Sequence, residues 1–255
     1  MMENITLEIK NHIGIVTFDH PPVNCLNYQI YKKLVAMFDQ INKMDEVRVV
    51  VFRAAGKRFC VGNDVNDIGN FTDKEKADDY LKTVSAGVRS IYKCRVPVVM
   101  AIQGACVGGG LAMAACSDII IASEDAYFGI PEIKIGAIGC AGFLALLVPD
   151  KVVRYMAYTG NSLTAQQLQH YGAVHKVVAV DKLFDTAMEV ANELLQQGPI
   201  ALRYFKEAIN INSKAQLEEE YAVEAGFTIK YVDTEDFSEA VKAFLEKRKP
   251  EYKCK

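Results

Sequence analysis

Two glycine-rich turns hold the residues of this chain that are best suited to chemistry. The first is Gly56-Lys-Arg-Phe-Cys-Val-Gly-Asn-Asp64, and the second is Gly104-Ala-Cys-Val-Gly-Gly-Gly-Leu111. Each follows an apolar run typical of a β-strand, and glycine there lets backbone N–H groups come close to a ligand. The second turn leads into a helical pattern, whose N-terminal end adds positive potential. Two N–H groups directed at one point would form an oxyanion hole, which stabilises negative charge on a carbonyl oxygen.

Other uses of a glycine triplet are tight packing of a helix on a sheet and the binding of phosphate. Residues 104–111 do not have the spacing GxxxxGK[ST], no lysine ends the stretch, and GxGxxG does not fit either. Nucleotide-phosphate binding at this turn is therefore disfavoured, and so is a dinucleotide-dependent dehydrogenase.

Glu132 is the candidate acid or base. A glutamate beside a proline can also be a solvated turn residue without a catalytic role. Glu132 ends the stretch Phe128-Gly-Ile-Pro-Glu132, where it is the only titratable residue. A positioned carboxyl group of this kind can move protons to and from a reacting carbon. A cysteine–histidine nucleophile pair is disfavoured, because none of the four histidines lies in a matching motif near Cys60 or Cys106.

The elements expected to hold these residues alternate between strand and helix. Apolar alternation and β-branched runs predict strands over residues 5–9, 14–18, 47–52, 96–102, 119–122 and 174–178. Apolar spacing near 3.6 predicts helices over residues 27–44, 74–94 and 110–116. This alternation is typical of parallel βαβ units in an α/β fold. Most of residues 183–249 is expected to be helical, with an interruption at Gly198-Pro199.

Composition narrows the class of protein further. The 255 residues are 51% hydrophobic with a net charge of −3, which is enough apolar content for a large core and disfavours a nucleic-acid partner. No apolar run of about 20 residues predicts a membrane span, and the start does not resemble a signal peptide. Seven cysteines without CxxC or zinc spacing indicate reduced thiols in the cytoplasm and no metal site.

Taken in order, the motifs resemble those of the enoyl-CoA hydratase/isomerase (crotonase) superfamily. The first turn is similar to FxAGAD[LI], the second to GxxxGGGxxLA, and the stretch around Glu132 to FxxPExxxG. Further similarities lie at Cys116–Ala122, at residues 161–174 and at residues 234–250, so the resemblance covers nearly the whole chain.

The resemblance implies a spiral of ββα units over residues 1–195, followed by a helical region, 196–255, for trimerisation and closure of the coenzyme A pocket. It implies a homotrimer or homohexamer that acts on an acyl-CoA and needs no cofactor beyond the coenzyme A of its substrate. The backbone N–H groups of Asn63 and Gly109 would form the oxyanion hole, and Glu132 would be catalytic. The remaining residues that the resemblance assigns to substrate or coenzyme A binding are Val23, Leu26, Lys57, Val61, Asp64, Val65 and Cys140.

Two departures from the family pattern bear on the reaction. Hydratases of the family use a second glutamate, at the position of Ala112, and a glycine at the position of Cys140. The prediction is therefore hydration or dehydration of an enoyl-CoA with a single glutamate. Double-bond isomerisation, or acyl-CoA binding without catalysis, stays open, and the sequence does not predict the acyl group.

Overall fold

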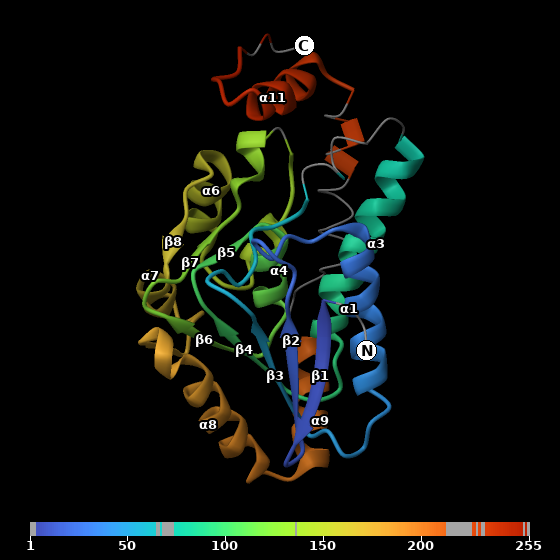
Figure 1. Cartoon of the computed structure of the whole chain (residues 1–255), viewed down its shortest axis with the longest axis vertical. Coiled ribbons are helices and arrows are strands. Elements are labelled where there is room, and N and C mark those ends of the chain that lie inside the picture. The colour runs from blue at the N-terminus through green and yellow to red at the C-terminus, as the bar shows by residue number, and fades with distance from the viewer. Residues whose placement is uncertain are drawn as a thin grey trace.

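The computed structural model describes residues 4–64, 67, 74–135, 137–212, 226–227, 229–230, 233–251 and 253. Its main sheet has six strands in the order β1-β2-β3-β4-β6-β9 (Figure 1). They are β1 (Ile5–Lys10), β2 (Ile13–Phe18), β3 (Val49–Ala54), β4 (Val98–Ile102), β6 (Ile119–Ser123) and β9 (Lys176–Val178). β1 is antiparallel to β2, and every later pair is parallel. The predicted α/β class is confirmed, because helices connect the parallel strands.

A second, three-stranded sheet was not predicted from the sequence. It consists of β5 (Ala105–Val107), β7 (Tyr127–Gly129) and β8 (Leu163–Thr164), in that order. Strands of two or three residues are too short to show an alternating pattern, which explains the omission. β5 lies inside the second glycine-rich turn, so this small sheet fixes the turn in place.

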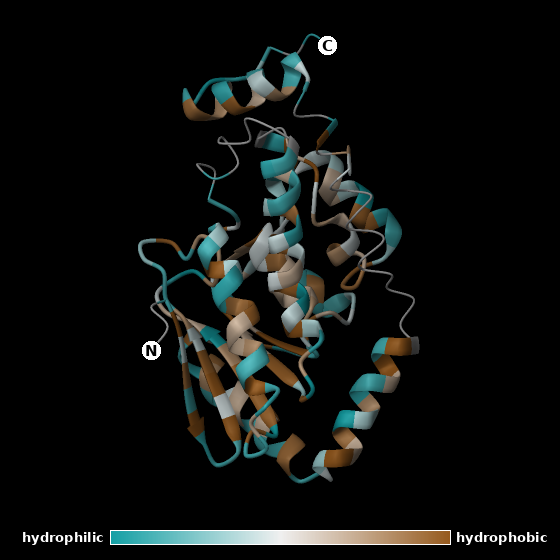
Figure 2. Ribbon diagram, turned by 90° about the vertical axis from the view of Figure 1, so that its right-hand side faces the viewer, coloured by the Kyte–Doolittle hydropathy of each residue, from teal (hydrophilic) through white to brown (hydrophobic). Residues whose placement is uncertain are grey.

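Helices cover both faces of the main sheet. α1 (Tyr28–Ile41) and α3 (Lys74–Tyr92) pack side by side on one flank, and α8 (Leu183–Leu195) lies on the other (Figure 1). Alternate residues of the central strands divide between the two cores: Val50 and Phe52 face the first, and Val49 and Val51 face α8. The strands are accordingly apolar along their length, as Figure 2 shows and as sheets buried on both faces require.

The remaining described helices are shorter or lie farther along the chain. They are α4 (Gly109–Ala115), η1 (Pro131–Ile135), α5 (Ala141–Leu144), α6 (Asp150–Thr159), α7 (Ala165–His170), η2 (Val180–Lys182), α9 (Pro199–Asn212) and α11 (Glu235–Leu245). α9 begins at Pro199, where the sequence predicted an interruption. α11 lies at the opposite end of the molecule from α9 (Figure 1) and contacts η1. No described helix is both long and apolar enough to cross a bilayer.

Candidate active site

The first glycine-rich turn is held by the segment that precedes α1. The buried Asn24 side chain donates to the carbonyl oxygens of Ala55 and Arg58, both at 2.8 Å. Leu26 N–H donates to Gly62 O at 2.8 Å, and Asp64 N–H donates to Leu26 O at 2.7 Å. These two bonds form a parallel bridge between Leu26 and Asn63. Backbone groups alternate in direction along an extended segment, so the N–H of Asn63 faces away from Leu26.

The second turn lies directly beside the first. The backbone N–H of Cys60 donates to Ala105 O at 2.9 Å, and the carbonyl oxygen of Cys60 accepts from Val107 N–H at 3.0 Å. These two bonds join the turns. Gly108 N–H donates to Gly129 O at 2.9 Å, and α4 begins at the next residue, Gly109. The first N–H groups of a helix have no partner within it, so the N–H of Gly109 is available to a ligand.

The glycines of the second turn are required by what surrounds them. Gly108 has φ +55°, and a Cβ atom there would lie 2.7 Å from Glu132 Oε1. A Cβ atom at Gly109 would lie 2.3 Å from the Tyr31 hydroxyl, 2.8 Å from Leu26 Cδ1 and 2.9 Å from Asn63 Oδ1. Real Cβ atoms do not approach other atoms so closely, so a side chain at either position would displace the groups around it.

One cavity brings these groups together. Its lining includes Asn63, Gly109, Ala112, Glu132 and Cys140, which come from both turns, from α4, from η1 and from the residue before α5. The rest of the wall is mostly apolar: Tyr80, Leu81, Val84, Ala137, Ile138, Gly139, Phe143 and Phe237. The cavity thus holds a carboxyl group close to two strand-end turns in surroundings that disfavour bulk water.

Three of the predicted site residues, Asn63, Gly109 and Glu132, line this cavity together, and Cys140 lines it too. Cys140 adopts the left-handed conformation with φ +66°, a conformation that favours glycine, the residue that the family pattern has there. Ala112, in place of a second glutamate, also faces the cavity, so the described lining contains one carboxyl group.

Five more of the predicted binding residues are described, and these do not line the cavity. Leu26 is fully buried with its Cδ1 atom against Gly109, Val23 and Val61 are half-buried, and Lys57 is exposed. Asp64 is half-buried and takes part in the bridge to Leu26 through its N–H. Val65 lies outside the described residues. Their assignment to coenzyme A stays a prediction.

Tyr31 and Phe237 were not assigned to the site from the sequence. Tyr31 falls in the apolar repeat of α1, so it reads as an ordinary core residue, yet its hydroxyl donates a hydrogen bond to Asn63 Oδ1. Phe237 is more than 170 residues from Asn63 in the chain, but it lines the same cavity from α11. Only the N-cap Thr234, whose hydroxyl accepts from Phe237 N–H at 3.1 Å, could have indicated where that helix begins.

The buried cysteines next to the turns are poor nucleophiles. Burial raises the pKa of the Cys60 thiol to about 12 and raises the pKa of Cys106 well above its usual range. The thiolate is the reactive form of cysteine, so these two groups are inert near neutral pH. Among the described residues no cluster of histidine, cysteine or carboxylate side chains could hold a metal ion.

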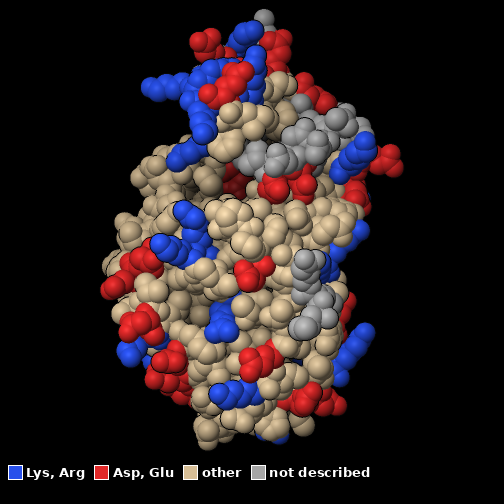
Figure 3. All heavy atoms as spheres, in the orientation of Figure 1, with Lys and Arg blue, Asp and Glu red and all other residues tan. Residues whose placement is uncertain are grey.

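One face of the molecule carries charges of both signs. In Figure 3, basic side chains gather at the end of the molecule where α11 lies, with acidic side chains among them, and scattered charges of both signs lie on a mostly uncharged surface below.

The chain is similar to a known protein family, to curated proteins and to solved structures. The family model described as Enoyl-CoA hydratase/isomerase matches residues 8–255. A curated relative from Rhodococcus jostii, (7aS)-7a-methyl-1,5-dioxo-2,3,5,6,7,7a-hexahydro-1H-indene-carboxyl-CoA hydrolase, is 38% identical over 85% of this chain and 84% of its own. The short-chain-enoyl-CoA hydratase of Clostridium acetobutylicum is 30% identical over 98% of this chain and 97% of its own. The crystal structure of a carnitinyl-CoA hydratase from Mycobacterium avium superposes with a TM-score of 0.86 at 26% identity and covers 100% of both chains.

Proposed function

The chain belongs to the enoyl-CoA hydratase/isomerase family, and on that premise we propose that it is an enzyme that converts an acyl-CoA thioester through its enolate. The observation that carries the proposal is the single cavity lined by Asn63, Gly109 and Glu132. The thioester oxygen would accept from the backbone N–H groups of Asn63 and Gly109. These donors are fixed before the reaction, so they favour the enolate, where the charge on that oxygen is greatest.

The favoured reaction is addition of water to an enoyl-CoA, or its reversal. Glu132 would take a proton from water while the water oxygen bonds to the β-carbon and the electrons of the double bond pass to the thioester oxygen. The enolate would then collapse as the same carboxyl group delivers its proton to the α-carbon. One carboxyl group suffices because the proton that it takes up is the proton that it returns.

The test is mass spectrometry of the purified protein with crotonyl-CoA and a 3-enoyl-CoA in heavy water, for wild type and Glu132→Gln. We expect water addition to crotonyl-CoA, and we expect it to fall by at least about 100-fold in the variant, because the amide cannot accept the proton. Glu124→Gln is the matched control, since Glu124 is exposed and does not line the cavity.

Other outcomes separate the alternatives. Double-bond migration or deuterium uptake without water addition would identify an isomerase, in which Glu132 moves a proton between two carbons. Binding of both thioesters without turnover by wild type or Glu132→Gln would contradict catalysis and leave a non-catalytic acyl-CoA-binding protein.

Hydrolysis of an oxo-acyl-CoA is a second candidate, supported by the 38% identical relative, whose name describes a hydrolase of a dioxo ring compound bound to CoA. If water attacks a ketone β to the thioester and the bond to the α-carbon breaks, the electrons pass into a thioester enolate. The same two N–H donors would stabilise that enolate. Incubation with a 3-oxoacyl-CoA in water labelled with ¹⁸O tests this reaction, because one label would enter the released carboxylic acid.

We further propose that the chain forms a homotrimer or homohexamer. Support comes from the apolar side chains that α9 exposes, among them Tyr204 and Ile211. Contiguous exposed apolar surface of this kind is typical of an interface between proteins.

A further inference from the structure

We infer that the side-chain amide of Asn63 is a third hydrogen-bond donor to the thioester oxygen and that Tyr31 is the residue that positions it. The inference rests on the proposed function, because it adds a donor to the same carbonyl site. Neither residue carries this role in the family motif around the first turn, where alanine is the residue at the position of Asn63.

The two side chains meet between the two turns. Tyr31 is fully buried on α1, and its hydroxyl donates to Asn63 Oδ1. Both polar atoms lie close to the Cα atom of Gly109: a Cβ built there would be 2.3 Å from the tyrosine oxygen and 2.9 Å from Asn63 Oδ1. The side-chain amide of Asn63 therefore lies beside Gly109, whose backbone N–H is assigned to the carbonyl oxygen together with that of Asn63 itself.

The hydrogen bond determines which way the amide faces. An asparagine amide is planar, so Oδ1 and Nδ2 point to opposite sides of the Cβ–Cγ axis. With Oδ1 directed at Tyr31, Nδ2 points to the other side of that axis. Within the described part of the chain, Nδ2 donates to no other group, and Asn63 lines the cavity. Two N–H donors on Nδ2 are thus available to a ligand in that cavity.

A donor at this position favours the enolate over the ground-state thioester, since the oxygen gains charge in the transition state. Loss of one such donor lowers kcat by about 100-fold in related sites, with a smaller effect on KM. We expect about that loss for Asn63→Ala, which keeps the backbone N–H. Tyr31→Phe keeps the ring and its packing but frees the amide to rotate, so we expect a loss of about 10-fold or more.

The test uses infrared difference spectra of butyryl-CoA labelled with ¹³C at the thioester carbonyl, bound to wild type, Asn63→Ala, Tyr31→Phe and the double variant. Each donor to the carbonyl lowers its stretching frequency, so we expect a lowered frequency in wild type and a smaller shift in both single variants. The double variant should match Asn63→Ala, because Tyr31 acts only through that amide.

Tyr28→Phe is the matched control. Tyr28 lies on the same helix, but its hydroxyl donates to Asp79 on α3 at 2.8 Å instead of to Asn63, and the substitution keeps its ring. The carbonyl frequency of butyryl-CoA bound to Tyr28→Phe, and the kcat of this variant, should equal those of wild type. An unchanged frequency in Asn63→Ala and Tyr31→Phe, with a lowered frequency in wild type, would overturn the inference and leave the backbone donors intact. A wild-type frequency equal to that of free butyryl-CoA would instead contradict the proposed function.

Discussion

At the scale of single residues, the position of Glu132 depends on the absence of a side chain at Gly108. A Cβ atom at position 108 would lie 2.7 Å from Glu132 Oε1. The glycine at this turn therefore serves two purposes: it permits φ +55°, and it leaves room for the carboxyl group. The same glycine thus determines both the backbone conformation of the turn and the position of the Glu132 carboxyl group.

Gly108→Ala tests this dependence. The new Cβ should displace the Glu132 carboxyl group, so we expect kcat for the favoured substrate to fall by about 10-fold or more. An alanine in this positive-φ conformation should also lower the free energy of unfolding by about 1–2 kcal/mol. Steady-state kinetics and thermal unfolding measure the two effects.

Gly56→Ala separates strain from displacement. Gly56 also has a positive φ, +79°, but a Cβ there would meet no atom within 4 Å. This control should lose a similar amount of stability with little loss of kcat. An equal loss of kcat in both variants would mean that backbone strain, and not contact with Glu132, controls the activity.

At the scale of elements, α11 closes one side of the cavity with Phe237. This side chain is buried, whereas Phe244 on the same helix is 47% exposed and does not line the cavity. We expect Phe237→Ala to raise KM for an acyl-CoA by about 10-fold, because it removes apolar surface worth roughly 1.5–3 kcal/mol when buried. Phe244→Ala should leave KM unchanged. Equal KM values for Phe237→Ala and wild type would show that α11 does not contact the acyl group.

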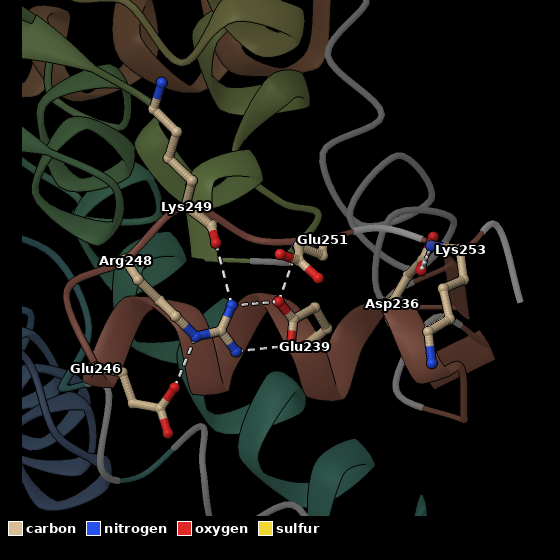
Figure 4. Close-up of polar contacts among 7 residues, drawn as sticks. All are labelled: Asp236, Glu239, Glu246, Arg248, Lys249, Glu251 and Lys253. Atoms are coloured by element: carbon tan, nitrogen blue, oxygen red, sulfur yellow. Dashed lines mark hydrogen bonds and ion pairs between the residues drawn. The ribbon is translucent and has the colours of Figure 1, made fainter.

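The end of α11 is tied down by the chain that follows it (Figure 4). Arg248 forms a bidentate ion pair with Glu239 and a second pair with Glu246 at 2.7 Å, and Glu251 N–H donates to Glu239 at 2.8 Å. Hydrogen bonds from Arg248 and from the backbone of Glu251 hold the pKa of Glu239 down at about 2, below its ordinary value of 4.5. The folded pKa is lower than the unfolded one, so the contribution to stability is present above pH 4.5 and is lost as the pH falls towards 2.

Glu239→Gln removes this titration. We expect the variant to lose less stability than wild type between pH 4.5 and pH 2, because it lacks the carboxylate that must be protonated. Thermal unfolding as a function of pH, with Glu246→Gln as the control, measures the difference. Parallel curves for wild type and Glu239→Gln over this range would contradict the assignment.

At the scale of the whole molecule, α9 presents apolar side chains that no described element covers. Tyr204 and Ile211 are 67% and 75% exposed. We expect light scattering after size-exclusion chromatography to give the mass of three or six chains. Tyr204→Lys combined with Ile211→Lys should shift that mass towards one chain, because charge at an apolar interface is costly.

Tyr158→Lys is the control for that experiment, since Tyr158 is equally exposed but lies on α6. A wild-type protein of single-chain mass would contradict the proposed oligomer. An oligomer that only Tyr158→Lys disrupts would place the interface on α6 and not on α9.

The sequence alone predicted the parallel α/β core, the two adjacent turns and the roles proposed for Asn63, Gly109 and Glu132. These features are local: alternation, helical spacing and ordered motifs each lie within a short stretch of chain. Parallel strands also end at the same edge of a sheet, so the turns after β3 and β4 had to lie close together.

Only the tertiary structure decided what stands around those turns. Tyr31 carries no local signal of a site, because it repeats with the core face of α1. Phe237 lies within the family resemblance over residues 234–250, but the motif does not say that its side chain lines the cavity. The contact of Tyr31 with Asn63 and the contact of Phe237 with the cavity depend on how α1 and α11 pack, and packing is set by long-range burial that no short pattern records. The direction of the Asn63 amide was likewise beyond the sequence, since it follows from a hydrogen bond between residues 32 positions apart.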